Sequence, residues 1–200
     1  MDGEEYRRKV LRLSDLDIED VGAVFQAASR RGEAHVQYAA FCILDDWITR
    51  FLPLFFRVEI LGPPIGKARP KSVRIKTKDG RTIPHTYTPT KTSEWEQAAA
   101  FLFKNQLRKS TERVQLITGP VVLKVEAIAD RPKRLYRKKD PEGRIWRETI
   151  PDGDNVLKTV GDALDKSVLG NDKQIVSWSI RGCYAAKYEG SMVVVRLYRL

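Results

Sequence analysis

The chain has little of what disulfide scaffolds, zinc sites and membrane anchors require. It contains 2 cysteines and 2 histidines among 200 residues, too few for a disulfide framework or for a zinc site built from these ligands. No apolar run approaches the roughly 18 residues that a membrane-spanning helix needs. The first five residues are acidic and lack the apolar core of a signal peptide. These absences predict a cytoplasmic protein with no membrane segment.

Negative charge is scarce over most of the chain. Residues 1–52 carry 7 Lys or Arg and 10 Asp or Glu, whereas residues 53–200 carry 29 and 16, which gives the second part a net charge of +13. A hydrophobic fraction of 42% is sufficient for a packed core and excludes a disordered chain. A folded and strongly basic protein most often binds a phosphate polymer, because neutralised phosphates release counterions. The alternative is a cationic surface that serves only solubility.

Two helices are predicted in the N-terminal extension, residues 1–52. Apolar side chains recur at helical spacing between Ser14 and Gly32 and again between Glu33 and Phe51. Pro53 then ends the second helix. The extension shows no pattern that indicates chemistry, and two roles stay open for this helical hairpin: enlarging a dimer interface or binding a partner.

Residues 53–200 form a second unit, in which strand and helix patterns alternate. Apolar and β-branched runs bounded by turn residues predict strands, and capping signals predict helices. In chain order we expect a strand at 54–61, a ribbon of 73–78 and 82–88 around Asp79-Gly80, a helix from Ser93 to Lys109 with a Ser93–Glu96 capping box, a strand at 120–129, a helix at 155–168, and strands at 174–180 and 191–198. This order predicts an α/β (α+β) fold, a small mixed sheet with helices packed on it.

Two segments of this unit concentrate positive charge. The first is the ribbon with the residues before it, and the second is the loop 131–147. The cations expected to contact DNA are Lys67, Arg69, Lys71, Arg74, Lys76 and Lys78 in the first segment and Arg134, Arg137, Lys138 and Lys139 in the second. An ordinary solvated hairpin is the simpler interpretation of the ribbon. In the second segment, Tyr136 and Trp146 either stack on unpaired bases or anchor the loop to the core.

Three aspartates stand out against this basic background. Asp152 and Asp154 flank Gly153 before a predicted helix, and Asp172 follows that helix. An extended backbone at 152–154 would turn both carboxylates to one side, and Asp172 joins them if the next strand lies beside the one leading into Asp152. Three hard oxygen donors suit Mg²⁺, with Mn²⁺ as a substitute, rather than zinc. The metal would activate water beside a scissile phosphate, and Lys158 would steady the developing charge.

Each of these residues also has a simpler explanation. An aspartate at a helix start is a routine cap, worth about 1 kcal/mol. Lys158 follows Asp154 by four residues, which is the spacing of an ordinary helical ion pair. Asp162 and Asp165 lie on the same stripe of the predicted helix and are equally consistent with a solvated face.

The acidic residues form an ordered motif. It runs Asp152-Gly153-Asp154-Asn155-Val156-Leu157-Lys158 and continues through Asp162-Ala163-Leu164 and Asp172-Lys173-Gln174. This motif resembles that of the RusA family of Holliday-junction-resolving endonucleases, and the earlier Gly62-Pro63-Pro64, Lys67 and Arg69-Pro70 resemble the family's N-terminal signature. The resemblance covers about residues 54–200. It implies a homodimeric, Mg²⁺-dependent endonuclease that cuts two strands of a four-way DNA junction symmetrically.

The resemblance also implies roles for individual residues. Matched by position, the metal ligands are Asp152, Asp154 and Asp172, and the catalytic lysine is Lys158. Asp162 matches a family position to which we give a supporting role. Family members often have two adjacent acids before the glutamine, whereas this chain has Asn171 and then Asp172. We match Asp172 to the catalytic acid.

Two other functions stay open on the residues alone. One is a basic DNA-binding module without catalysis, in which the aspartates only cap and brace a helix. The other is a nuclease that prefers flaps or replication forks. The chain carries no visible signal for the sequence at which cleavage would occur.

Overall fold

The computed structural model describes residues 52–110, 116–149 and 151–199, together with residues 27, 30–32 and 36. The helical hairpin expected within residues 14–52 therefore lies outside the described residues, apart from these few positions. All the predicted site residues lie inside them.

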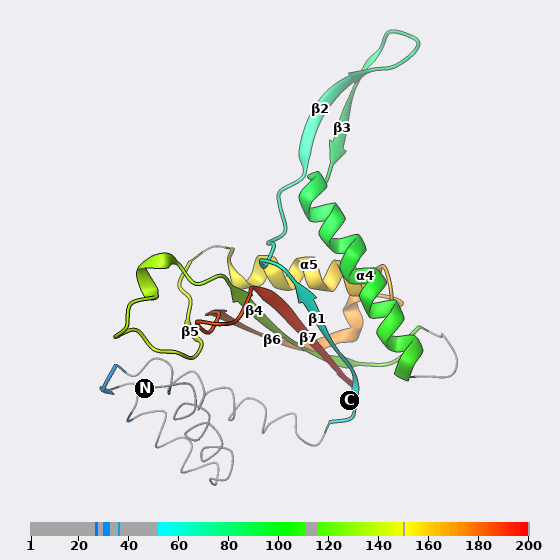
Figure 1. The fold of residues 1–200 in the computed structure, drawn as a ribbon. Helices are drawn as coiled ribbons and strands as arrows, with labels where there is room; N and C mark the ends of the chain where they lie inside the picture. The colour runs from blue at the N-terminus through cyan, green and yellow to red at the C-terminus, as the bar shows by residue number, and fades with distance from the viewer. Residues whose placement is uncertain are drawn as a thin grey trace.

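A five-stranded mixed sheet forms the body of the domain (Figure 1). Across the sheet the strands follow the order β1 (Leu54–Leu61), β7 (Met192–Arg199), β4 (Val121–Ala129), β6 (Ile175–Tyr184) and β5 (Ile145–Trp146). β4 and β6 run parallel, and the other neighbours are antiparallel. A parallel pair needs a crossover connection, and here the crossover carries helix α5 (Gly153–Asp165).

Helices α4 (Thr90–Ser110) and α5 cover one face of this sheet (Figure 1). The strands present apolar side chains to them by alternation: in β1, Phe56, Val58 and Ile60 are buried while the residues between them are exposed. The rings of Phe56 and Phe103 stack with centroids 5.7 Å apart, which joins β1 to α4. Of the helices that the structure describes, none combines the length and the apolar character needed to cross a membrane.

Strands β2 (Lys71–Lys76) and β3 (Thr82–Tyr87) form a separate antiparallel ribbon that projects from the body (Figure 1). All residues of both strands are exposed, so backbone pairing and the turn hold the ribbon together. Gly80 has a φ of +81°, a conformation that glycine adopts without strain. The ribbon predicted around Asp79-Gly80 is therefore confirmed, and its first strand begins two residues earlier than expected.

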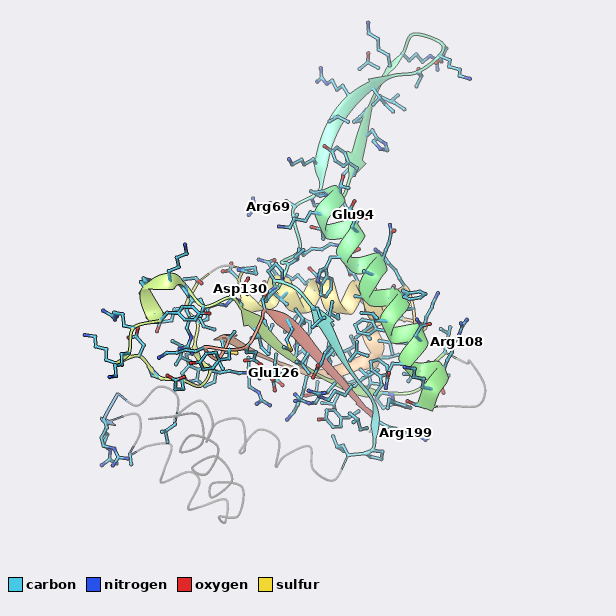
Figure 2. The ribbon with its side chains drawn as sticks, viewed as in Figure 1. Arg69, Glu94, Arg108, Glu126, Asp130 and Arg199 are labelled. Atoms are coloured by element: carbon cyan, nitrogen blue, oxygen red, sulfur yellow. The ribbon has the colours of Figure 1, made fainter. Side chains whose placement is uncertain are left out.

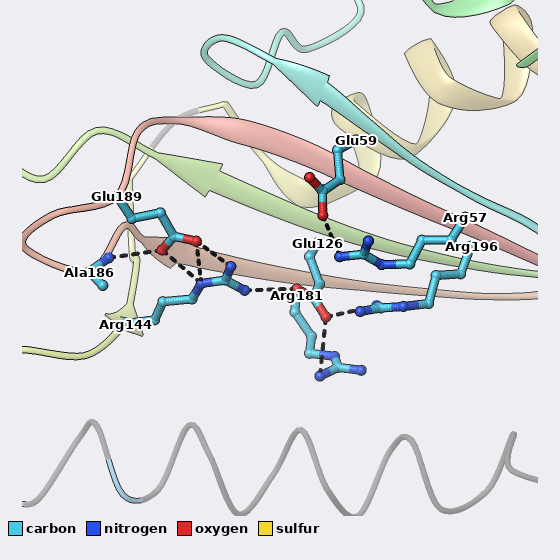
Figure 3. A network of polar contacts seen from close by, with 8 residues as sticks. All are labelled: Arg57, Glu59, Glu126, Arg144, Arg181, Ala186, Glu189 and Arg196. Carbon is cyan, nitrogen blue, oxygen red and sulfur yellow. Dashed lines mark hydrogen bonds and ion pairs between the residues drawn. The ribbon is translucent and has the colours of Figure 1, made fainter. Parts of the chain in front are cut away.

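The sheet face opposite the helices carries a cluster of charges (Figure 3). Glu126 of β4 accepts hydrogen bonds from Arg144 (Oε2–Nη1 3.0 Å) and Arg196 (Oε1–Nη1 2.8 Å), and Arg181 Nη1 lies 3.6 Å from Oε1. Burial raises the pKa of Glu126, but the hydrogen bond and charge of Arg196 and the charges of Arg181 and Arg144 outweigh it, so the pKa lies below its usual 4.5. Arg144 also donates to Glu189 (Nε–Oε2 2.9 Å), which ties the loop before β5 to the loop after β6.

The predicted α+β fold is confirmed, and within residues 53–200 the expected elements occur in the expected order with the short strand β5 added. The start of α4 is a correction. The helix begins at Thr90, so Ser93 lies inside its first turn and the predicted Ser93–Glu96 capping box does not form there. The side chain of Glu96 instead points into the protein, where it is 1% exposed.

Candidate functional site

The N-terminal end of α5 carries two of the predicted acids. Asp152 is the residue before the helix, with extended backbone angles (φ −62°, ψ 145°), and Gly153 already begins the helix. The expectation of an extended segment through Asp154 is therefore corrected, because Asp154 lies in the first helical turn. The Asp152 side chain makes no capping hydrogen bond to the described turn. A capping role, the simplest explanation of this residue, thus does not account for its carboxylate.

Lys158 lies one turn along α5 and pairs with Asp154. Its ammonium Nζ is 2.9 Å from Asp154 Oδ2, and the two side chains are 54% and 64% exposed. The hydrogen bond from Lys158 holds the pKa of Asp154 below its ordinary value. The helical ion pair expected from the spacing is present. Since both groups are solvent-exposed, this pair contributes little to stability.

Asp172 begins a short 3₁₀ turn, Asp172–Gln174, that leads into β6. Asn171 caps this turn, because its Oδ1 accepts a hydrogen bond from the backbone N–H of Lys173 (2.9 Å). Gln174 fastens the turn to the body by donating from Nε2 to the carbonyl oxygens of Ile117 (2.8 Å) and Gly119 (3.0 Å). Asn171 and Gln174 thus fix the position of Asp172. The role of Asn171 is structural and does not require a carboxylate.

A cleft of about 240 Å³ between α5 and the start of β6 is lined by both Lys158 and Asp172. Its lining residues are Leu157, Lys158, Gly161, Asp162, Asp172, Lys173, Ile175 and Trp178. Asp154 is paired with the cleft residue Lys158, whereas Asp152, the residue before α5, is not among the residues that line the cleft. Among the described residues, no three carboxylate, histidine or cysteine side chains are grouped so that they could hold a metal ion. The three predicted donors fit a hard divalent cation by their chemistry, whereas their side chains do not converge in this structure.

Lys67 belongs to a charge network around the buried carboxylate of Glu96 that connects α4 to α5. Its ammonium group donates to Glu96 (Nζ–Oε1 2.6 Å) and to Asp162, and Lys166 donates to the second oxygen of Glu96. Burial lowers the pKa of Lys67, but the hydrogen bonds and charges of Asp162 and Glu96 outweigh it, and the pKa is raised overall. The Lys67 ammonium group is thus engaged by two carboxylates of the protein in this structure, and its contact with DNA stays a prediction.

The loop before the ribbon packs directly on the first turn of α5. The backbone N–H of Lys67 donates to the carbonyl oxygen of Asn155 (2.9 Å). A Cβ on Gly66 would lie 2.9 Å from Pro151 Cβ and 3.2 Å from Asn155 Cβ, so a side chain at this position would displace the loop or the helix. Two motifs separated by almost 90 residues in the sequence therefore meet at one place, and the absence of a side chain at Gly66 permits the contact.

The other cations predicted to bind DNA are on the surface. Arg69 lies at the base of the ribbon, whose side chains project away from the body (Figure 2). The exposed residues are Arg69, Lys71, Arg74, Lys76, Lys78, Arg134, Arg137, Lys138 and Lys139. Arg137 is partly neutralised, because it donates to Asp140 (Nη2–Oδ1 3.1 Å) and holds the pKa of that carboxyl below its ordinary value. The two basic segments thus present their charge to solvent.

The basic loop 131–147 is anchored by residues beneath it. The guanidinium of Arg131, 5% exposed, donates to the carbonyl oxygens of Ala185 (Nε–O 2.8 Å), Pro141 and Gly143. Burial lowers the pKa of Arg131. Trp146 packs against a small apolar cluster on the same side of the sheet. Of the two interpretations that the sequence left open, anchoring applies to Trp146, whereas the Tyr136 side chain is 45% exposed.

Sequence reasoning missed two features of the site. The Lys67–Glu96 pair joins residues 29 positions apart, and no local pattern indicates that they meet. Trp178 lies at the mouth of the cleft with 58% of its surface exposed. The available signal for Trp178 was its place near the start of a predicted strand that follows Asp172 directly.

The chain is similar to known proteins over most of the described domain. Residues 62–197, more than half of the chain, match the family described as endodeoxyribonuclease RusA. The chain is also similar to the uncharacterized protein YqaN of Bacillus subtilis (strain 168), with 29% identity over 131 residues that cover 63% of this chain and 85% of that protein. The matched region begins at Gly62, contains the ribbon and both helices, and ends in β7. The chain therefore belongs to the RusA family of endodeoxyribonucleases.

Proposed function

We propose that this protein is a divalent-cation-dependent endonuclease that resolves four-way DNA junctions by paired cleavage of two strands. The observation that supports this most is that Asp172 and Lys158 line one cleft, while the Asp152 carboxylate at the start of α5 does not cap its helix. Membership of the family supports nuclease activity on branched DNA. Exposed carboxylates within a domain of net positive charge are an arrangement that stability alone does not require.

Nucleases of this family generally depend on a divalent metal. We propose that Asp152, Asp154 and Asp172 hold the cation, with Mg²⁺ as the physiological ion and Mn²⁺ as a substitute, and that their carboxylates, which are apart in this structure, come together when it binds. When bound, such an ion lowers the pKa of a water ligand and neutralises charge on the scissile phosphate. Asp154 is paired with Lys158 in this structure. Binding of the cation by Asp154 would therefore compete with that ion pair.

Lys158 has two properties that suit a catalytic group. It is exposed at the cleft, and its partner is an exposed carboxylate rather than a buried one. An exposed pair exchanges partners at little cost, so the ammonium group is available to a phosphate oxygen. We propose that Lys158 stabilises the charge that develops on the phosphate during cleavage.

The basic ribbon and the basic loop would supply most of the DNA affinity through phosphate contacts. A four-way junction presents two equivalent strands, and a two-fold symmetric homodimer presents two equivalent active sites to them. We therefore propose a homodimer as the active form. Junction specificity then follows from the spacing of two sites rather than from readout of bases.

The proposal is tested by a cleavage panel of fixed junctions, mobile junctions, flaps, forks and plain duplex, each with Mg²⁺ and with a chelator. We expect paired cuts in junctions with Mg²⁺ and none with the chelator. Asp152→Asn should abolish cleavage and preserve or tighten junction binding, because a negative charge near phosphate is lost. Asp165→Asn, which removes an exposed carboxylate at the other end of α5, should cut normally.

Other outcomes of the panel select the alternatives. Tight junction binding without cleavage under any cation would identify a non-catalytic DNA-binding module. Faster cleavage of flaps or forks than of junctions would identify a different preferred substrate. Unchanged cleavage by Asp152→Asn would remove the proposed active site.

A further inference from the structure

Trp178 occupies an unusual position for a large aromatic residue. It lies in the first half of β6, opposite Leu123 of β4, so it is on the sheet face that the helices cover. Among the described strands, β5 pairs with β6 at Cys183 and Tyr184, which leaves the outer edge of β6 uncovered at Trp178. The indole is 58% exposed and is not part of either core cluster. Packing within the described domain therefore does not account for a tryptophan here.

Besides the indole, the cleft beside Trp178 is lined by two apolar side chains and by four charged ones, of which Asp162 and Asp172 are acidic. Leu157 and Ile175 contribute the apolar surface, and both pack with the main core. Lys158 and Lys173 supply positive charge on the two sides, from α5 and from the turn before β6. A flat apolar group that carries phosphates on both sides matches this arrangement, since its face can lie on the indole while the phosphates reach the lysines.

We propose that this cleft binds the base of an unpaired nucleotide next to the scissile phosphate, with Trp178 as the stacking platform. The inference rests on the proposed function, because it takes the same cleft as the place of cleavage. Trp178 would then be a substrate-positioning residue that favours DNA whose bases are locally unstacked. Bases inside a continuous duplex have both faces covered by their neighbours, whereas branch points and ends leave a face accessible.

The chemistry of the cleft favours a nucleotide over a protein segment. An apolar protein partner would cover the indole with apolar side chains and would leave Asp162, Asp172 and the two lysines poorly solvated. A nucleotide satisfies the lysines with its phosphates while it covers the indole with its base. Docking of a protein chain is therefore an outcome that the test below must separate from nucleotide binding.

The test compares Trp178→Ala, Trp178→Phe and Trp178→Leu on a junction that carries 2-aminopurine next to the cleavage site. Loss of one base-stacking contact predicts roughly 5- to 150-fold higher KM for the alanine variant, with a smaller change in kcat. The phenylalanine variant should recover most of the loss and the leucine variant should not. The rise in 2-aminopurine fluorescence on binding should change only in variants that lack the aromatic ring. Tyr188→Ala is the matched control, because Tyr188 is 95% exposed in the loop after β6.

Several results would overturn the inference. Junction binding and fluorescence equal to wild type in Trp178→Ala would do so, as would equal rescue by leucine and phenylalanine. A change of oligomeric state in gel filtration, with unchanged DNA affinity, would assign Trp178 to a protein interface instead. Asp172→Asn in the same assay separates this inference from the proposed function. If Asp172→Asn abolishes cleavage while Trp178→Ala is normal, the stacking site fails and the nuclease site stands, and if neither variant changes cleavage, both fail.

Discussion

At the scale of single residues, the position of α5 depends on the buried carboxylate of Glu96. Two lysines, Lys67 and Lys166, bind its two oxygens, and Lys67 also binds Asp162 on α5. A carboxylate that is 1% exposed is costly to bury unless its charge is neutralised in this way. The ion pairs of Lys67 and Glu96 therefore link α4, the loop before the ribbon and α5 at one point, close to the proposed site.

Replacing Lys67 separates a positioning role from DNA contact. Lys67→Met should lower the free energy of unfolding by roughly 2 kcal/mol, because Glu96 keeps only Lys166 and Asp162 loses its partner. Arg69→Met, two residues away at an exposed position, should change stability by about 0.5 kcal/mol or less and act on DNA affinity instead. Urea denaturation and junction-binding titrations of both variants make the comparison. Weaker binding with unchanged stability in Lys67→Met would return this residue to the DNA interface.

At the scale of elements, the ribbon has two different faces. Arg74 and Lys76 lie on one face, while Val73 and Ile75 alternate with them and lie on the other beside Ile83. The whole ribbon is exposed, so no contact within the described fold explains its positive charge. The charge then serves either solubility or the binding of a polyanion. A two-stranded ribbon is also narrow enough to enter the major groove of DNA.

The salt dependence of binding measures whether the ribbon contacts phosphates. Replacing Lys71, Arg74 and Lys76 together with glutamine should reduce the slope of log affinity against log salt by about 3. The matched control replaces three exposed cations toward the C-terminal end of α4, Lys104, Arg108 and Lys109, which lies away from the ribbon. Equal slope changes in the two triple variants would show that general charge, rather than the ribbon, sets the affinity.

At the scale of the whole molecule, the two faces of the sheet differ in how their charged side chains are arranged. The helix-covered face carries the exposed acids of the candidate site, and the opposite face carries a paired cluster around Glu126 (Figure 3). The Glu126 side chain is 7% exposed and lies within 3.6 Å of three arginines on β6, β7 and the loop before β5. Through Glu126, this cluster connects β6, β7 and the loop before β5.

The pH dependence of stability should report this cluster. Because the folded pKa of Glu126 is depressed below 4.5, its stabilisation is complete above pH 4.5 and is lost as the pH falls through the folded value. Glu126→Gln should lower stability by roughly 3 kcal/mol at neutral pH and flatten the loss below pH 4.5. Glu59→Gln, which breaks the exposed Arg57–Glu59 pair, should cost less than about 1 kcal/mol. Thermal unfolding between pH 3 and pH 7 tests both, and an unchanged acid limb in Glu126→Gln would contradict this account.

Local patterns predicted most of the elements. Apolar and β-branched runs placed β1 and β4, the Asp79-Gly80 turn placed the ribbon, and helical spacing placed α5, because each of these signals acts within a few residues. The same local reasoning failed at the N-terminal ends of the two helices α4 and α5. It treated Glu96 as a cap and extended the backbone through Asp154, since a capping pattern and a buried acid look alike until their distant partners are known.

The sequence by itself therefore determined the family, the order of the elements and the chemical types of the site residues, since motif and periodicity are properties of neighbouring positions. Only the tertiary structure decided which residues meet. It placed Lys67 on Glu96 and Asp162, Gly66 against the first turn of α5, and Trp178 at the cleft with Asp172 and Lys158. The physical reason is that these contacts join segments about 30 to 95 residues apart or depend on the geometry of helix against strand, and side-chain charge and volume act there through space rather than along the chain.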